Sequence, residues 1–154
     1  MTRRQILRIL DANFNRSREG LRVCEEIARF VLEMPSLTRD LKAARHRVSD
    51  CLKNLPVGFS DLLASRNTRE DVGRTPSEFK SQRYAALDLF AANAERAKES
   101  LRVLEEASKL LDAALAAKFK KIRFQVYAIE KRALPRLEAL RDHGFRRAWG
   151  SDAR

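Results

Sequence analysis

An internal repeat constrains the fold of this chain more than any other feature. Residues 11–31 match residues 91–111 at an offset of 80, and nine of the 21 positions are identical; a chance alignment would give roughly one or two. A second pair of segments, 41–48 and 119–126, matches at an offset of 78. The two-residue difference falls in the connection, where changes of length are tolerated. The chain therefore contains two copies of one structural unit.

Both segments of each copy have the periodicity of amphipathic helices. Apolar residues recur in steps of three and four over 10–31 and 37–55, and again over 90–111 and 115–133. Cys24 and Cys51 lie within these apolar patterns, which favours buried thiols. Five glycines and four prolines are too few for the turns of an all-β fold.

Residues that begin or end helices divide the chain into four. Pro35 should end the first helix, and Ser36 can cap the second. Pro56 and Gly58 should end the second helix, and Asp112 is a candidate cap between the last two. Because the connections within each copy are short, we expect each pair of helices to be antiparallel neighbours.

We predict a single all-α domain over 1–141, a pseudo-twofold four-helix bundle made of two repeated α-hairpins. Repeat one spans 5–56, a long crossover spans 57–80, and repeat two spans 81–141. A chain of 154 residues is long enough to bury one core. Pro135 should kink or end the fourth helix. The segment 142–154 has no clear pattern, so we expect a tail that is frayed or docked by Phe145 and Trp149.

The charge balance favours anionic partners. The chain has 32 Lys and Arg against 21 Asp and Glu, a formal net charge of +11. Phosphorylated metabolites, nucleic acid or an acidic surface would all suit this charge. Nucleic acid is disfavoured because aromatic residues make up only 7% of the chain and no helix has a basic, aromatic reading face. Neither common glycine-rich phosphate loop occurs, so Arg, Lys or helix N-termini would hold a phosphate.

Compartment and membrane association can also be predicted. There is no apolar run of about 18 residues, so we expect no membrane span. The N-terminal segment lacks the apolar stretch of a secretory signal, and two cysteines are too few for a disulfide framework. We therefore expect a cytoplasmic protein.

The repeat also duplicates polar residues near the apolar stripe. Asn13 lies within about 50° of the centre of its apolar seam, and Arg16 flanks it; Asn93 and Arg96 are the equivalents in repeat two. One interpretation is a buried polar network that fixes the register of the bundle. The other is an anion pocket lined by paired Asn and Arg, which the symmetry would bring together.

A second set of duplicated charges faces away from the seam. One interpretation is a surface ladder of ion pairs, each worth tenths of a kcal/mol. The other is a face that meets a ligand or a second subunit in a homo-oligomer. Arg45 and Arg123 flank their seams and could either snorkel or point at a phosphate. The ladder residues are Glu19, Arg22 and Glu26, with Glu99, Arg102 and Glu106 as their equivalents.

The crossover is the last candidate region. It is either an ordinary polar connection or a site with the parts that phosphoryl transfer uses: arginines for phosphate, a carboxylate for Mg²⁺ and a glycine for a turn. The residues concerned are Arg66, Thr68, Arg69, Asp71 and Gly73.

Five ordered blocks together resemble a known family. They are NFNRSREGLRVCEEIARF, LKAARHRV, LLASRNTREDVG, NAERAKESLRVLEE and FKKIRFQVY, and the resemblance covers about 5–132. The family is the small hydroxymethylpyrimidine-phosphate kinase of bacterial thiamin synthesis, which is also found fused to the N-terminus of some thiamin-phosphate synthases. The resemblance implies ATP-dependent phosphorylation of 4-amino-5-hydroxymethyl-2-methylpyrimidine phosphate to the diphosphate, with the unphosphorylated alcohol excluded as a substrate. The family reads Arg-Asp-Thr where this chain has Arg66-Asn67-Thr68, which puts a metal-binding carboxylate in doubt.

From the residues themselves we form a hypothesis for the site. The catalytic clamp on the phosphates would be Arg16, Arg66 and Arg96, with Asp71. Mg²⁺, brought with ATP as co-substrate, would be held by Asp71 with Glu26 or Glu106. The substrate-binding residues would be Asn13, Asn93, Arg22, Arg102, Arg45, Arg123 and Thr68. The alternative function is a non-catalytic helical module for dimerisation or regulation.

Overall fold

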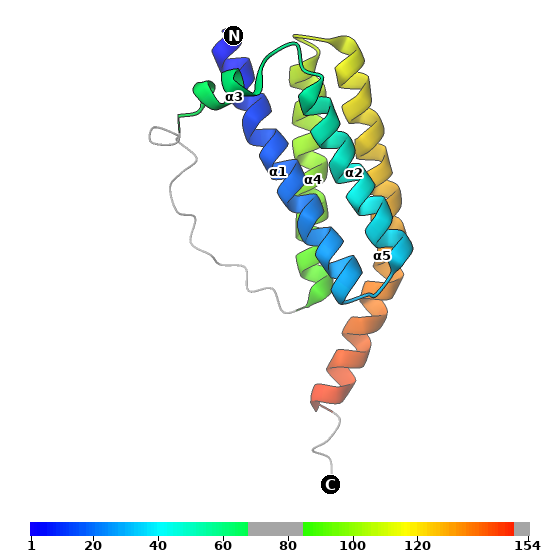
Figure 1. Ribbon diagram of the computed structural model, residues 1–154. Helices are drawn as coiled ribbons and strands as arrows, with labels where there is room; N and C mark the ends of the chain where they lie inside the picture. Colours follow the sequence, from blue (N-terminus) through cyan, green and yellow to red (C-terminus); the bar gives the residue numbers. More distant parts are fainter. Residues whose placement is uncertain (68–84, 150–154) are drawn as a thin grey trace.

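The protein is all-helical in the part of the chain that the computed structural model describes, residues 1–67 and 85–149, with side chains as far as residue 140. Five helices occur there and no strand: α1 (Arg3–Phe30), α2 (Pro35–Lys53), α3 (Phe59–Ser65), α4 (Ala86–Ser108) and α5 (Ala113–Trp149) (Figure 1). The predicted fold class is confirmed. No helix among these residues is long and apolar enough to cross a membrane.

The four long helices form the predicted bundle. α1 and α4 run antiparallel through its middle, α2 packs against α1, α5 packs against α4, and α2 and α5 also touch each other (Figure 1). The antiparallel order places the C-terminal part of α1 beside the start of α4, where the Cys24 thiol donates to the Phe90 carbonyl at 3.5 Å. The pseudo-twofold relation stays a prediction, but equivalent residues of the two repeats make equivalent contacts, as described below.

The core consists of the residues that the periodicity singled out. Every apolar residue of the four predicted patterns is buried, except that Val31 is exposed and Leu111 is only partly buried. Phe14 of repeat one and Phe119 of repeat two meet edge to face, with ring centroids 5.5 Å apart. Both cysteines are buried and unpaired. Burial raises the pKa of the Cys24 thiol to about 12.

A glycine sets the distance between the two central helices. A Cβ at Gly20 would lie 2.7 Å from the backbone oxygen of Asn93. Atoms that are not bonded do not approach so closely, so only glycine lets α1 and α4 pack at this separation. The equivalent position in repeat two is Ser100, whose hydroxyl donates to the Arg96 carbonyl of its own helix at 2.7 Å.

Two predicted helix boundaries differ from the structure. Met34 is the N-cap of α2, and Pro35 is already its first residue, so Ser36 does not cap the helix; proline suits that position because its missing N–H is not needed there. Pro135 does not end α5, which continues to Trp149 and extends beyond the bundle (Figure 1). The predicted tail is thus helical as far as Trp149. The expectation at Asp112 is confirmed, since its side chain accepts from the Ala114 backbone at 2.8 Å.

The crossover begins with a helix that was not predicted. In α3, the Asp61 carboxylate accepts from the Gly58 backbone at 3.2 Å, and Leu62 and Ser65 are buried. Seven residues are too few to show a helical period in the sequence. The helix lies against the N-terminal part of α1 (Figure 1).

Candidate anion-binding site

Two buried glutamates organise the polar contacts of the bundle. Glu25 accepts from Arg22 Nη1 at 3.3 Å and from Arg45 Nε at 2.9 Å, and so connects α1 to α2. Glu105 accepts from Arg102 Nη1 and Arg123 Nη2, each at 2.8 Å, and connects α4 to α5. Each glutamate is 5% exposed. Sequence reasoning missed their role, although their identity across the repeat was a signal.

The second half of the predicted surface ladder is present in both repeats, whereas Glu19 and Glu99 form no ion pair with a described residue. Arg22 pairs with Glu26 one turn later, and Arg102 pairs with Glu106 at 2.9 Å. A hydrogen bond from Lys109 also lowers the pKa of Glu106. Because α1 and α4 are antiparallel, these two sets lie at opposite ends of the bundle and do not form one site.

No metal centre is evident where the structure can be read. Among the described residues there is no group of three or more His, Cys, Asp and Glu side chains that could hold a metal ion. Glu26 and Glu106 are engaged with arginines, as above. Thr68 and Asp71, proposed for the substrate and for Mg²⁺, lie outside the described residues, as do Arg69 and Gly73.

No described contact joins the paired Asn and Arg residues into one pocket, so that pocket stays a prediction. Asn13 and Asn93 are buried, and their amide groups donate to the carbonyls of Ile9 and Leu89 one turn earlier, each at 2.8 Å. Arg16 and Arg96 are exposed instead of facing the core. Each buried amide is thus satisfied within its own helix.

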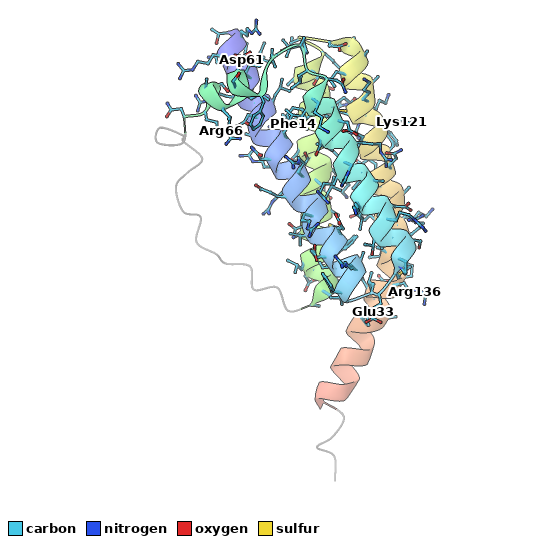
Figure 2. All side chains as sticks on the ribbon, in the orientation of Figure 1. Phe14, Glu33, Asp61, Arg66, Lys121 and Arg136 are labelled. Carbon is cyan, nitrogen blue, oxygen red and sulfur yellow. The ribbon has the colours of Figure 1, made fainter. Side chains whose placement is uncertain are left out.

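Arg66, predicted in the phosphate clamp, binds a buried carboxylate. Its Nε and Nη2 donate to the two oxygens of Asp11 at 2.5 and 2.8 Å. The bond to Asp11 raises the pKa of the guanidinium. Asp11 is 7% exposed and was not predicted as a site residue. The pair attaches the end of α3 to α1 (Figure 2), so much of the Arg66 charge is already neutralised.

Three arginines of repeat one line an open groove of about 500 Å³ at the contact of α1 and α2. We call it the arginine groove. It includes Arg22 and Arg45, both predicted to bind substrate, and Arg18, which the sequence did not single out. The remaining residues that line it are Asn15, Glu19 and Val23.

The same place in repeat two carries an aromatic ring and paired charges. Tyr127 stands where repeat one has Ser49, and its hydroxyl accepts from Arg123 at 3.3 Å. Lys98 stands in the place of Arg18 and pairs with Glu95 and Glu130, each at 2.7 Å. The equivalents of those two carboxylates in repeat one are Asn15 and Leu52. Repeat one has therefore lost both the aromatic ring and the two acids that close this surface in repeat two.

Arg18 is consequently left without a counter-ion. Its Nε is buried and has no hydrogen-bond partner, and no carboxylate among the described residues pairs with it. In contrast, although burial opposes its charge, the bonds from Lys98 to Glu130 and Glu95 raise the lysine pKa above its usual value.

Arg45 also retains donors for a ligand. Only its Nε is bonded, to Glu25, and its two Nη groups have no partner within the described residues. Its equivalent Arg123 is more fully engaged, by Glu105 and Tyr127, and the bond to Glu105 raises its pKa.

Guanidinium groups with unbonded N–H donors are suited to binding phosphate. Their planar N–H donors bind two oxygens at once, and desolvation strengthens such bonds. The volume of the groove suits a small phosphorylated molecule, and its described lining contains one carboxylate, that of the exposed Glu19, which makes no ion pair with another described residue.

Comparison with known proteins identifies the lineage of this bundle. No solved structure matches the chain at a significant level. The chain is 44% identical over 126 residues to a thiamine-phosphate synthase of Synechocystis sp.. This alignment covers 81% of the present chain and 35% of the relative. The chain is 43% identical over 126 residues to a thiamine-phosphate synthase of Rhodopirellula baltica, with 81% and 33% covered. The chain thus spans about a third of the length of these curated relatives. The model of the ThiD2 family matches residues 8–132, and the chain belongs to this family.

Proposed function

We propose that this protein is a kinase of thiamin synthesis that converts 4-amino-5-hydroxymethyl-2-methylpyrimidine phosphate to its diphosphate with Mg·ATP. The observation that carries the proposal is the open groove of repeat one, in which Arg18 has no carboxylate partner among the described residues and Arg45, paired through its Nε with Glu25, keeps two unbonded Nη groups. Family membership and the thiamine-phosphate synthase relatives support the pathway, and the resemblance of the five sequence blocks supports the kinase reaction.

The reaction places simple demands on the protein. An oxygen of the substrate phosphate attacks the γ-phosphorus of ATP, the bond from that phosphorus to the ADP oxygen breaks, and the pyrimidine diphosphate and ADP leave. The attacking phosphate is largely dianionic near neutral pH, so no strong base is required. What is required is that several negative charges be held together in line. In this proposal Arg18 and Arg45 hold the phosphates, and Mg²⁺ arrives with ATP.

Some predicted roles change in this assignment. Arg22 keeps a place at the groove, although Glu25 and Glu26 share its charge. Arg102 and Arg123 become structural, since they are bonded within the closed surface of repeat two. The described contacts neither assign nor exclude the catalytic roles predicted for Arg16, Arg96 and Asp71. The same holds for the substrate-binding role of Thr68.

The first experiment is a coupled assay of ADP release. It contains Mg·ATP with the pyrimidine monophosphate, and in parallel the unphosphorylated alcohol. We expect turnover of the monophosphate alone. Without turnover, and without a shift in melting temperature from either ligand, the kinase proposal is wrong, and the chain is the non-catalytic helical module that the sequence also allowed.

A variant locates the activity. Arg18→Met removes the charge and keeps a side chain of comparable length, so we expect kcat/KM to fall about 100-fold, as for a lost charged contact to phosphate. Arg4→Met, at an exposed position outside the groove, is the matched control and should keep the wild-type rate. Equal rates for the two variants would separate the reaction from the arginine groove.

The family difference at Asn67 can be tested in the same assay. If a carboxylate at this position contributes to Mg²⁺ binding, Asn67→Asp lowers the Mg²⁺ concentration needed for half-maximal rate. An unchanged Mg²⁺ dependence would show that the asparagine is not a defect.

A further inference from the structure

A second cationic cavity lies on the other side of α2. It measures about 360 Å³ and opens between α2 and α5, lined by Arg47 from α2 and by Lys118 and Lys121 from α5. Figure 2 labels Lys121 on α5. Arg47 is two residues from Arg45 of the arginine groove, a rotation of about 200° around a helix, so the two sites are on opposite faces of α2.

The charges in this cavity are not neutralised. Arg47, Lys118 and Lys121 form no ion pair with any described residue. The one acid in the lining, Asp50, pairs at 3.3 Å with Lys53 on its own helix. Three cations with one engaged carboxylate favour an anion with more than one negative charge.

The cavity also contains an unused acceptor. Gln125 lines it, and its Oε1 is buried without a hydrogen-bond partner. A buried acceptor without a donor is costly, so a ligand that supplies an N–H or O–H group would be favoured here. Asn54 lines the opposite wall from α2.

The repeat shows how such a cavity is closed elsewhere. Adding the offset of 78 to Asn54 gives Arg132, and Asp40 precedes Lys118 by the same offset. Arg132 and Asp40 form an ion pair at 2.5 Å that spans α5 and α2. The cavity is therefore the place where the equivalent of this closing pair has been replaced by an asparagine and an unpaired lysine.

We propose that the cavity between α2 and α5 is a second anion site, separate from the arginine groove, for a small phosphorylated molecule that carries an amino or hydroxyl donor. Lys118, Lys121 and Arg47 bind the phosphate, and Gln125 accepts from the donor. This inference goes beyond the proposed kinase function and does not depend on it.

The test uses the full chain with Arg18→Met, so that binding in the groove is weakened, and inorganic pyrophosphate as the probe in calorimetry. We expect one site per chain. Asn54→Arg with Lys118→Asp installs the closing ion pair and should weaken pyrophosphate binding at least tenfold. Lys42→Ala, which causes the same net charge change at an exposed position outside the cavity, should leave binding unchanged. Equal losses of pyrophosphate affinity in the two variants would mean that the overall positive charge, and not the cavity, attracts the anion, and would overturn the proposal. An absence of pyrophosphate binding would also overturn it.

Two further measurements define the site. Gln125→Met should weaken binding of AMP, which carries N–H and O–H donors, about tenfold and leave pyrophosphate unaffected; no difference would overturn the role of Gln125. In an otherwise wild-type chain, Asn54→Arg with Lys118→Asp should keep the basal kinase rate. If this double variant lost both the kinase rate and pyrophosphate binding, the cavity would be the catalytic site. That result would overturn the proposal that the cavity is separate from the arginine groove. A chain without kinase activity could still bind the probe, so the two proposals fail independently.

Discussion

The two repeats build the same scaffold and finish its surface differently. In each, a buried glutamate holds an arginine of its own helix and an arginine of the neighbouring helix, through Glu25 in one repeat and Glu105 in the other. Beside the second scaffold, Tyr127 covers the surface and Lys98 has two carboxylate partners. Beside the first, a groove remains open and Arg18 has no carboxylate partner in the described part of the chain.

This difference assigns separate roles to repeated and unrepeated residues. Among the polar residues that are identical in both repeats, the buried glutamates and their arginine partners hold helices together, because a structural demand acts on both copies. Arg18, which lines the open groove without a carboxylate partner among the described residues, lies at a position where the copies differ. Divergence between the copies beside the shared Arg22 and Arg45 therefore indicates the functional surface.

The largest expected effect tests the shared scaffold. Glu105→Ala leaves Arg123, whose side chain is 13% exposed, without its main partner, and Glu25→Ala does the same to Arg45. Removing one member of a buried pair costs about 3–5 kcal/mol. We expect losses of about 3 kcal/mol for both variants in urea unfolding, against less than about 0.5 kcal/mol for the exposed Glu99→Ala. A loss below about 1 kcal/mol in either variant would show that the glutamates do not hold the scaffold.

Most of the fold could be predicted because the burial pattern is local. Each long helix repeats its buried positions many times, so single exceptions such as Val31 do not change the result. Helix boundaries depend on fewer residues, and for this reason Ser36 was misjudged and Pro135 does not end its helix, one of the two outcomes expected of it. Pro135 is exposed, and the packed residues Ala133 and Leu137 on either side of it keep α5 in place.

The candidate site could be predicted only in part. Arg22 and Arg45 were named because the repeat duplicates them, and both line the arginine groove. Arg18 was missed because an unpaired arginine looks like any other in a sequence with 34% charged residues. Its lack of a partner depends on Asn15 one turn away and on Leu52 and Ser49 of another helix. Likewise, Asp11 and Arg66 are 55 positions apart, and only the packing of α3 brings them together.

The second prediction exchanges the surfaces of the repeats. Asn15→Glu with Ser49→Tyr gives repeat one the acid and the ring of repeat two. We expect kcat/KM to fall about 100-fold, or about 2.7 kcal/mol in transition-state binding, with no loss of melting temperature because the new groups are paired. The reverse exchange, Glu95→Asn with Tyr127→Ser, should leave kcat/KM unchanged. If the reverse exchange lowered the rate as much, repeat two would share in the site and the comparison would break.

The third prediction concerns the contact between the repeats. Gly20→Ala places a methyl group 2.7 Å from the Asn93 oxygen, and a backbone atom cannot move aside as a flexible side chain would. We expect the free energy of unfolding to fall by about 2 kcal/mol, a typical cost of overpacking. Ser100→Ala at the equivalent position adds no atoms at Cβ and should cost less than about 1 kcal/mol. Thermal unfolding of the two variants measures the difference, and a stabilised Gly20→Ala protein would show that α1 and α4 can separate freely.

The smallest effect distinguishes the repeats by pH. Burial raises the pKa of Cys24 from 9.0 to about 12, with a further contribution from the charge of Glu130, whereas its equivalent in repeat two is Leu104. Between these two values the unfolded chain loses the thiol proton and the folded chain keeps it. The stabilisation is therefore complete below pH 9 and declines as the pH rises, by about 1.4 kcal/mol per pH unit for one proton.

Urea unfolding at pH 8 to 10.5 under reducing conditions should show this decline in the wild type and a shallower one in Cys24→Ala, in which Cys51 and Lys98 still titrate. Leu104→Ala should keep the wild-type slope while losing stability at every pH. Parallel curves for the wild type and Cys24→Ala would mean that the folded thiol ionises as easily as the unfolded one, and that the packing of Cys24 against α4 is looser than its burial indicates.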